Sequence, residues 1–122
     1  MKRIALVAAL MLATPVAAQQ YIAVDGDTIR SDKERIRIMG LDTPETYFAK
    51  CSLERSRGYH AAGRLQRLLN SRTVRIERAG RDKYRRTLAR VYVGGENVAS
   101  IMIREGLARP NHGQRRQPWC NQ

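Results

Sequence analysis

Residues 21–39 read YIAVDGDTIRSDKERIRIM and contain the pattern that decides the fold. The segment 35–39 alternates between two kinds of side chain, which places Ile36 and Ile38 on one face of a strand and Arg37 on the opposite face. The alternation therefore predicts a strand that buries its isoleucines and carries Arg37 away from the main hydrophobic layer.

Two helices and further strands are predicted from the remaining periodicity. Apolar residues recur at intervals of three and four between Leu53 and Leu69, which is typical of an amphipathic helix. A second, shorter helix should begin near Asn97, a suitable cap, and end at Gly106. The expected apolar positions of the first helix are Tyr59, Ala62, Leu65 and Leu69, and the other expected strands are residues 21–24, 28–30, 73–77 and 88–93. The order fits a β-rich α+β fold, a five-stranded Greek-key barrel of the OB type with two helices, although a generic α+β sheet would have almost the same pattern.

Residues 1–18 are typical of a secretory signal peptide. Lys2 and Arg3 precede an apolar run, and small residues before Gln19 offer a cleavage site. The run is shorter than the roughly 20 residues that cross a bilayer, so cleavage is favoured over an uncleaved membrane tether. The mature chain is expected to be residues 19–122, a single domain with an irregular tail over residues 109–122. We expect a monomer in the periplasm or outside the cell, without stable membrane association.

The composition favours a polyanionic partner. The chain has 23 Lys and Arg against 11 Asp and Glu, a formal net charge of +12. Such a charge attracts nucleic acid, and it also fits a protein that acts at anionic membrane surfaces. Neither expected helix combines a wide apolar face with a continuous basic face, which argues against the membrane interpretation.

The two cysteines, Cys51 and Cys120, favour one disulfide over two free thiols in an exported chain. Closing so long a loop would stabilise the fold by about 4 kcal/mol in the loop-entropy model. Trp119, beside Cys120, is expected to pack over the disulfide, with stacking on a nucleobase as the alternative.

Acidic residues are concentrated in two short turns of this basic chain. Asp25 and Asp27 flank a glycine, and Asp42 precedes Thr43-Pro44, where the proline fixes the direction of the Thr43 carbonyl. Two carboxylates and a carbonyl oxygen suit Ca²⁺ or Mg²⁺, with water completing the shell. Either cluster alone would be read as an ordinary turn.

Arg37, Glu45 and Arg86 supply what phosphodiester cleavage needs. A carboxylate can orient or deprotonate a water, and guanidinium groups can bind the phosphate oxygens as their charge grows. Arg115 and Arg116 are interpreted as solvated charge, and His60 and His112 as ordinary histidines without metal-ligand partners.

Taken together, these residues resemble the thermonuclease, or staphylococcal-nuclease-like, family. The resemblance runs from about Tyr21 to Ala108, and any one of its motifs alone would be weak. The motifs that carry it are Val24-Asp25-Gly26-Asp27-Thr28, Arg37, Leu41-Asp42-Thr43-Pro44-Glu45, Asp82-Lys83-Tyr84 with Arg86, Leu88-Ala89, and Arg104-Glu105-Gly106-Leu107-Ala108.

The resemblance implies a secreted, calcium-dependent OB-fold nuclease that cuts DNA and/or RNA and leaves 3′-phosphate ends. It implies that Asp27, Asp42 and the Thr43 carbonyl bind Ca²⁺, with Asp25 acting through water. The implied catalytic residues are Glu45 as the general base and Arg37 and Arg86 as the phosphate-binding pair. Lys83 and Tyr84 would contact the nucleotide.

Two departures separate this chain from the family pattern. Arg85 stands where the family usually has a glycine, and it would cost about 1 kcal/mol if the backbone there has a positive φ. The tail after Ala108 lacks the base-stacking tyrosines and the third helix, so a base preference is not transferred. The alternative function is a non-catalytic OB-fold module that binds nucleic acid or protein.

Overall fold

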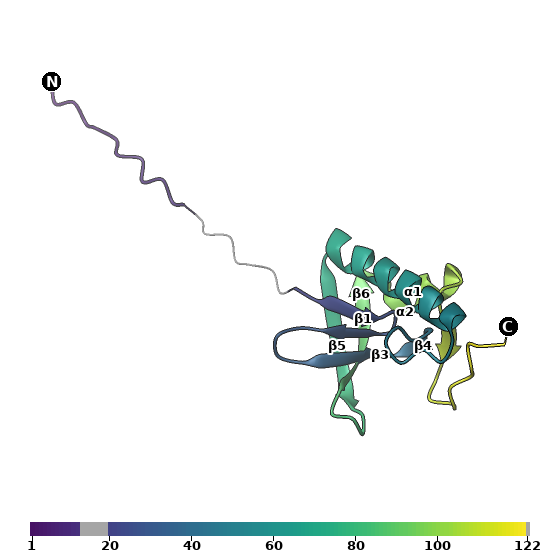
Figure 1. The fold of residues 1–122 in the computed structure, drawn as a ribbon. Helices are drawn as coiled ribbons and strands as arrows, with labels where there is room; N and C mark the ends of the chain where they lie inside the picture. Colours follow the sequence, from purple (N-terminus) through teal and green to yellow (C-terminus); the bar gives the residue numbers. More distant parts are fainter. Residues whose placement is uncertain (13–19, 122) are drawn as a thin grey trace.

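The computed structural model describes residues 1–12 and 20–121 (Figure 1). The predicted cleavage site before Gln19 lies outside the described residues. Within them, no helix has the length and apolar character that crossing a membrane requires.

A mixed sheet forms the main layer of the fold. Its strands follow the order β1-β2-β3-β6-β5, and β7 pairs with β6. β3 and β6 are parallel, whereas the other neighbours are antiparallel. The bounds are β1 Ile22–Asp25, β2 Thr28–Arg30, β3 Arg35–Ile38, β5 Val74–Arg81, β6 Thr87–Val93 and β7 Glu96–Asn97. The mixed sheet and two helices confirm the α+β class, and five strands lie on the main path.

A second, two-stranded sheet was not predicted. β4 (Gly40–Asp42) pairs antiparallel with β8 (Arg109–Asn111), so that Asp42 is opposite Arg109. The tail therefore begins as a strand, and the expectation of an irregular segment from residue 109 onward was wrong for its first three residues. Pro110 weakens the sequence pattern of a strand, but a two-stranded sheet has only edge strands, where proline is tolerated.

Both predicted helices are present. α1 (Ser52–Ser71) begins after Cys51, whose sulfur accepts the Glu54 N–H, and α2 (Val98–Arg104) begins after Asn97. The Asn97 side chain accepts the Ala99 and Ser100 N–H groups, as a cap should. Tyr59, predicted for the apolar face of α1, is 62% exposed.

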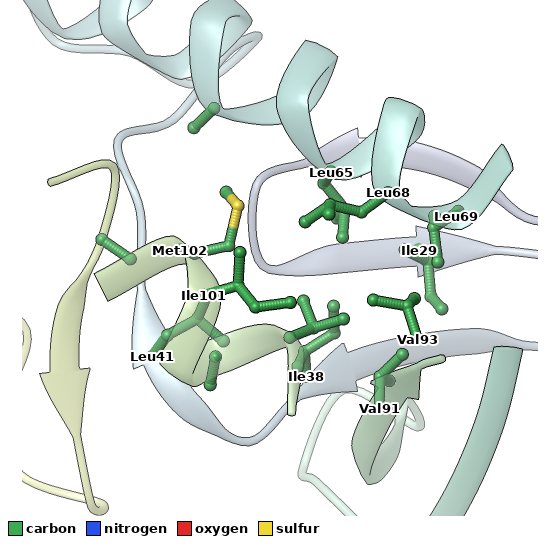
Figure 2. Close-up of a cluster of buried hydrophobic side chains, with 14 of the residues drawn as sticks. Ile29, Ile38, Leu41, Leu65, Leu68, Leu69, Val91, Val93, Ile101 and Met102 are labelled. Carbon is green, nitrogen blue, oxygen red and sulfur yellow. The ribbon is translucent and has the colours of Figure 1, made fainter. Parts of the chain in front are cut away.

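The core fills the space between the sheet and the two helices (Figure 2). Ile29, Ile36 and Ile38 from the sheet, Leu65 from α1 and Met102 from α2 are at most 1% exposed. Burying one such side chain stabilises the fold by about 1.5–3 kcal/mol, so this layer fixes the position of β3. Because Ile36 and Ile38 point inward, Arg37 between them points to the opposite face of the strand, as predicted.

Candidate functional site

Three predicted site residues from separate strands or strand ends lie together. Asp27 follows β1, Arg37 lies in β3, and Asp42 ends β4. Arg37 Nη2 is 3.5 Å from Asp27 Oδ2 and 3.9 Å from Asp42 Oδ1. Arg37 Nη1 donates to the Ile38 carbonyl at 2.7 Å, which fixes the guanidinium beside both buried carboxylates.

The turn at Asp27 is held against the segment after β4. Asp27 Oδ2 accepts the Thr43 backbone N–H at 3.1 Å, and Oδ1 accepts the Thr28 hydroxyl at 3.0 Å. A Cβ added at Gly26 would lie 2.7 Å from Ala61 Cβ and 2.8 Å from Thr43 Cγ2. The glycine therefore allows α1 and Thr43 to approach the turn closely.

Asp25 also holds the segment after β4 in place, through hydrogen bonds from Thr46. Its Oδ1 accepts both the backbone N–H of Thr46 at 3.0 Å and the Thr46 hydroxyl at 2.7 Å. The interactions observed for this carboxylate therefore anchor the stretch that follows Glu45.

Glu45 is positioned by α1 through a residue that the sequence analysis missed. Glu54 Oε2 accepts the Glu45 backbone N–H at 3.1 Å, and Oε1 accepts the Lys50 N–H at 2.9 Å. A Cβ at Gly58 would lie 2.1 Å from the Glu45 carbonyl oxygen, so the helix backbone touches the segment directly. The available signal was an acidic residue in the first turn of the helix, a position that often satisfies free backbone N–H groups.

Burial changes the proton affinity of two of these carboxyl groups. It raises the pKa of Glu45 to about 7, an effect that the positive charge of Arg116 opposes and that neighbouring carboxylates reinforce. Burial likewise raises the pKa of Asp42, and Arg116 again opposes the change. We refer to Asp27, Asp42 and Glu45 as the acidic cluster.

Arg116 lies against the acidic cluster, so its interpretation as solvated charge was wrong. Its Nη1 is 3.0 Å from Asp42 Oδ1 and 2.8 Å from Glu45 Oε1, and its Nη2 donates to the Thr43 carbonyl at 2.6 Å. The signal was weak in the sequence, because nothing about Arg115-Arg116 distinguishes an arginine that folds back from one in water.

Buried polar atoms without a hydrogen bond also gather here. In the described part of the chain these are Asp42 Oδ1, Thr43 Oγ1 and the Trp119 indole nitrogen. Asp42 Oδ1 is close to Arg116, but the geometry is that of an ion pair without an aligned N–H. Such an oxygen is suited to a cation. Among the described residues, no three Asp, Glu, His or Cys side chains lie together in a way that could hold a metal ion. The predicted ligand set instead has two carboxylates and a carbonyl.

The loop of residues 82–86, called here the arginine loop, places Arg86 within its own turn. Asp82 Oδ2 accepts Arg86 Nε at 2.8 Å, and Asp82 Oδ1 accepts the backbone N–H groups of Tyr84 and Arg86, each at 2.9 Å. Arg85 has a φ of 65°, the condition under which arginine is strained relative to glycine. The contacts observed for Arg86 are thus local, whereas Arg37 contacts the acidic cluster.

Lys83 and Tyr84, the other two predicted residues of this loop, lie close to Arg86. Lys83 Nζ and the Arg86 guanidinium lie 5.2 and 5.5 Å from the centre of the Tyr84 ring, which is exposed. Two cations beside an exposed aromatic ring form a surface that can contact an anion and a base together.

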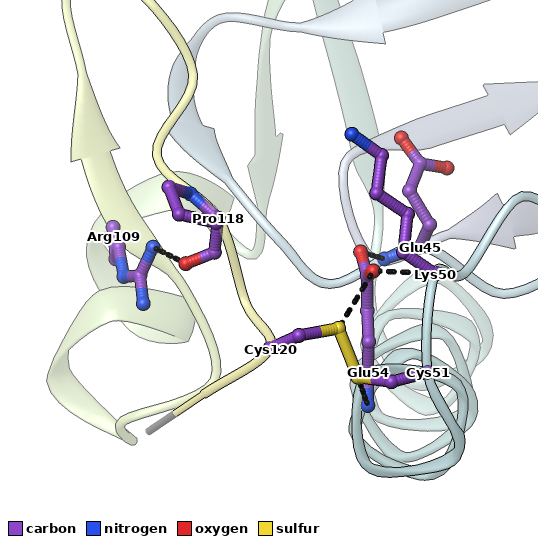
Figure 3. The surroundings of a disulfide bond; sticks show 7 residues. All are labelled: Glu45, Lys50, Cys51, Glu54, Arg109, Pro118 and Cys120. Atoms are coloured by element: carbon purple, nitrogen blue, oxygen red, sulfur yellow. Dashed lines mark hydrogen bonds between the residues drawn. A yellow bond between two sulfur atoms is a disulfide. The ribbon is translucent and has the colours of Figure 1, made fainter.

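The predicted disulfide joins Cys51 to Cys120 and brings the tail to the start of α1 (Figure 3). The neighbouring Trp119 is buried, and the Arg109 guanidinium lies 3.6 Å from the centre of its ring. A buried indole under a guanidinium fits packing better than stacking on a base.

Comparison with known proteins identifies the family. A family model described as Staphylococcal nuclease homologue matches residues 35–119. The chain belongs to the staphylococcal nuclease homologue family. A thermonuclease of Staphylococcus intermedius is 39% identical over 105 residues, and the match covers 79% of this chain and 62% of that protein. The endonuclease YncB of Bacillus subtilis (strain 168) is 40% identical over 94 residues, which are 71% of this chain and 44% of that protein.

This member of the staphylococcal nuclease homologue family spans about half the length of the curated relatives it matches. One of them, a thermonuclease of Staphylococcus hyicus, is 38% identical over 92 residues, and the match covers 70% of this chain and 54% of that protein. The family match extends through Trp119 and so includes Arg37, Asp42, Glu45 and Arg116. Asp27 lies before the matched range, but its contacts with Thr43 and Arg37 attach it to the same site.

Proposed function

We propose that this protein is a calcium-dependent nuclease that hydrolyses phosphodiester bonds in DNA and/or RNA. The observation that carries the proposal is the position of Arg37 beside the buried carboxylates of Asp27 and Asp42. Family membership supports the same reaction class.

Asp27, Asp42 and the Thr43 carbonyl are the proposed calcium ligands. Asp42 Oδ1 supports this choice, because it is buried and its neighbour at 3.0 Å is already a positive group, the Arg116 guanidinium. A set of so few protein ligands predicts weak binding, in the range of about 10⁻⁴ to 10⁻³ M. When bound, the ion would supply positive charge to the phosphate and to the oxygen that attacks it.

The chain's own residues have separate roles in the proposed reaction. Glu45 accepts a proton from the attacking water or orients it, and Arg37 binds phosphate oxygens as their negative charge increases. Arg86 is proposed as the second phosphate-binding residue, with Lys83 and Tyr84 contacting the nucleotide. Attack of the water oxygen on phosphorus would break the bond to O5′, which takes up a proton, and would leave a 3′-phosphate end and a 5′-hydroxyl end.

Two hollows that are lined in part by site residues offer space for a nucleic-acid strand. One, of about 700 Å³, is lined by Arg37, Leu88 and His112 among others, and another, of about 750 Å³, is lined by Glu45, Lys50 and Arg116 among others. A strand that crosses from one hollow to the other would carry its backbone past both Arg37 and Glu45.

Closure of the main sheet into an OB-type barrel, export after signal cleavage and a monomeric state are further parts of the proposal. The strand path β1-β2-β3-β6-β5 and the family match support the barrel. The Cys51–Cys120 disulfide is consistent with an oxidising compartment.

The decisive experiment is a digestion series on single-stranded DNA and on RNA with purified protein. Cleavage should occur in calcium and stop in an excess of chelator, and end-group analysis should find 3′-phosphates. Cleavage that continues unchanged in chelator would contradict the metal dependence, and absence of cleavage under every condition would contradict the nuclease.

A non-catalytic binding module is the second candidate. Two observations favour it: Arg86 is paired with Asp82 in its own loop, and Arg116 lies against the acidic cluster. Metal-independent binding of nucleic acid without cleavage would support this function instead.

A further inference from the structure

Arg116 contacts the same oxygens that a divalent cation would use. Its guanidinium lies 3.0 Å from Asp42 Oδ1, 2.6 Å from the Thr43 carbonyl oxygen and 2.8 Å from Glu45 Oε1. Two of these oxygens belong to the proposed calcium ligands, and the third belongs to the proposed base. The guanidinium therefore supplies positive charge at the point where the acidic residues need it.

The segment that carries Arg116 is fixed at both ends. β8 pairs with β4, the strand that ends in Asp42, and Cys120 is bonded to Cys51 at the start of α1. Arg109 also donates to the Pro118 carbonyl at 3.0 Å and covers Trp119, as Figure 3 shows in part. We call residues 112–119 the tail loop. Its fixed ends keep Arg116 near the acidic cluster at a high effective concentration.

We propose that Arg116, which also pairs with Glu45, competes with a divalent cation for Asp42 and the Thr43 carbonyl, and that the disulfide-tethered tail loop thereby sets the cation affinity of the site. The inference rests on the proposed function for the identity of the ligands. A guanidinium nitrogen and a metal ion cannot occupy the same position beside Asp42 Oδ1 and the Thr43 carbonyl, because their contact distances overlap and their charges repel. By linkage, whatever strengthens the hold on Arg116 weakens cation binding, and cation binding releases Arg116.

The first test compares Arg116→Gln with Arg115→Gln. Both variants remove one positive charge from an exposed residue, but it is Arg116, with 38% of its side chain exposed, that contacts the acidic cluster. Calorimetric titration of each full-length protein with calcium, without nucleic acid, measures the affinity directly. Arg116→Gln should bind calcium about tenfold or more tightly. In the unaltered protein the ion must first displace the guanidinium from Asp42 and Thr43, whereas in the variant these oxygens are already open. Arg115→Gln should stay within about twofold of the unaltered protein, since an exposed charge acts only through a screened field.

The second test releases the tether. Cys51 caps α1, and serine is a favoured cap, so Cys51→Ser with Cys120→Ser removes the bond while keeping the start of the helix. The calcium affinity of this double variant should rise, though less than that of Arg116→Gln. Adding Arg116→Gln to the double variant should then have a smaller effect than it has in the tethered protein, since the two changes act on one interaction.

A spectroscopic signal separates displacement of the tail loop from a simple change in charge. Trp119 is the single tryptophan of the chain and is close to Arg116 in sequence. Calcium should change its fluorescence in the unaltered protein and in Arg115→Gln, and much less in Arg116→Gln. Thermal unfolding of each variant checks that it is folded.

The outcomes distinguish this inference from the proposed function. Calcium binding with equal affinity in all variants, or equal tightening by Arg116→Gln and Arg115→Gln, overturns the role of Arg116 and leaves the calcium site intact. If none of the proteins binds calcium, both the calcium site and the competition are overturned. Cleavage of nucleic acid is not needed for either reading.

Discussion

The acidic cluster and the arginine loop both contain predicted catalytic residues, but they are held in place differently. Glu45 is held by Glu54 of α1, nine residues further on, and Asp42 and Glu45 both contact Arg116 of the tail loop, near the other end of the chain. Arg86 is fixed by Asp82, four residues before it. The acidic cluster therefore depends on the assembled fold, whereas the arginine loop depends on its own turn.

The largest expected effect comes from the acidic cluster. Glu45→Gln keeps the size of the side chain but removes its capacity to accept a proton, so cleavage should fall by about 10²- to 10⁴-fold in kcat/KM. Steady-state kinetics on single-stranded DNA measure the loss. Glu77→Gln, which alters an exposed acid of β5, is the matched control and should keep nearly full activity. An active Glu45→Gln protein would rule out the assigned base.

A smaller loss is expected when the arginine loop is altered. Asp82→Asn removes the charged partner of Arg86 while retaining an oxygen for the backbone N–H groups. Cleavage should fall about tenfold or more, since displacing a catalytic group by about 1 Å can reduce the rate about 10²-fold. Because the pair is near the surface, the free energy of unfolding should change by less than about 1 kcal/mol. The control is Asp32→Asn at an exposed turn; equal rates for the two variants would show that Asp82 does not position Arg86.

The third prediction tests the dependence of the acidic cluster on α1. Gly58→Ala would place a Cβ 2.1 Å from the Glu45 carbonyl oxygen. The helix and the Glu45 segment must then separate, which should destabilise the fold by about 1–3 kcal/mol and lower the cleavage rate. Denaturant unfolding measures the first effect. Gly63→Ala, on the same helix with its nearest neighbour at 3.6 Å, should instead stabilise it by about 0.5–1 kcal/mol. Similar results for both alanines would contradict the close contact.

The smallest expected effect concerns strain in the arginine loop. Arg85 has a positive φ, so Arg85→Gly should stabilise the protein by up to about 1 kcal/mol. Arg85→Ala removes the same charge but keeps the Cβ, and it should give no such gain. Melting temperatures of the two variants separate backbone strain from charge; equal stability would mean that the positive φ carries no penalty.

The sequence predicted those features that depend on local pattern. The alternation at Ile36 and Ile38, the cap at Asn97 and the α+β class follow from short stretches, and the structure confirms them. The pairing of β4 with β8 was not predicted, because three residues in each strand leave almost no periodicity. Tyr59 occupies a helical position next to the apolar face, and its exposure depends on packing that a pattern does not contain.

The same division applies to the site. The residue types of the acidic cluster indicated cation and phosphate chemistry. Carboxylates that gather in an otherwise basic chain repel one another unless a cation lies among them. Glu54 and Arg116 were missed, because their contacts with Glu45 and Asp42 join different elements of the fold. Such contacts become visible only when the fold places α1 and the tail loop around Glu45.

The disulfide turns residues 51–120 into a covalent ring that contains both helices, while β1 to β4 lie outside it. A protease that cuts once inside the ring, for instance at the arginine loop, releases no fragment until the bond between the sulfurs is reduced. A cut at the exposed Tyr47-Phe48 pair lies outside the ring and separates Asp27, Asp42 and Glu45 from the rest of the chain. Resistance to digestion should therefore depend on the exposed segments before Cys51, among them the turn at Asp32 and the residues between Glu45 and Cys51.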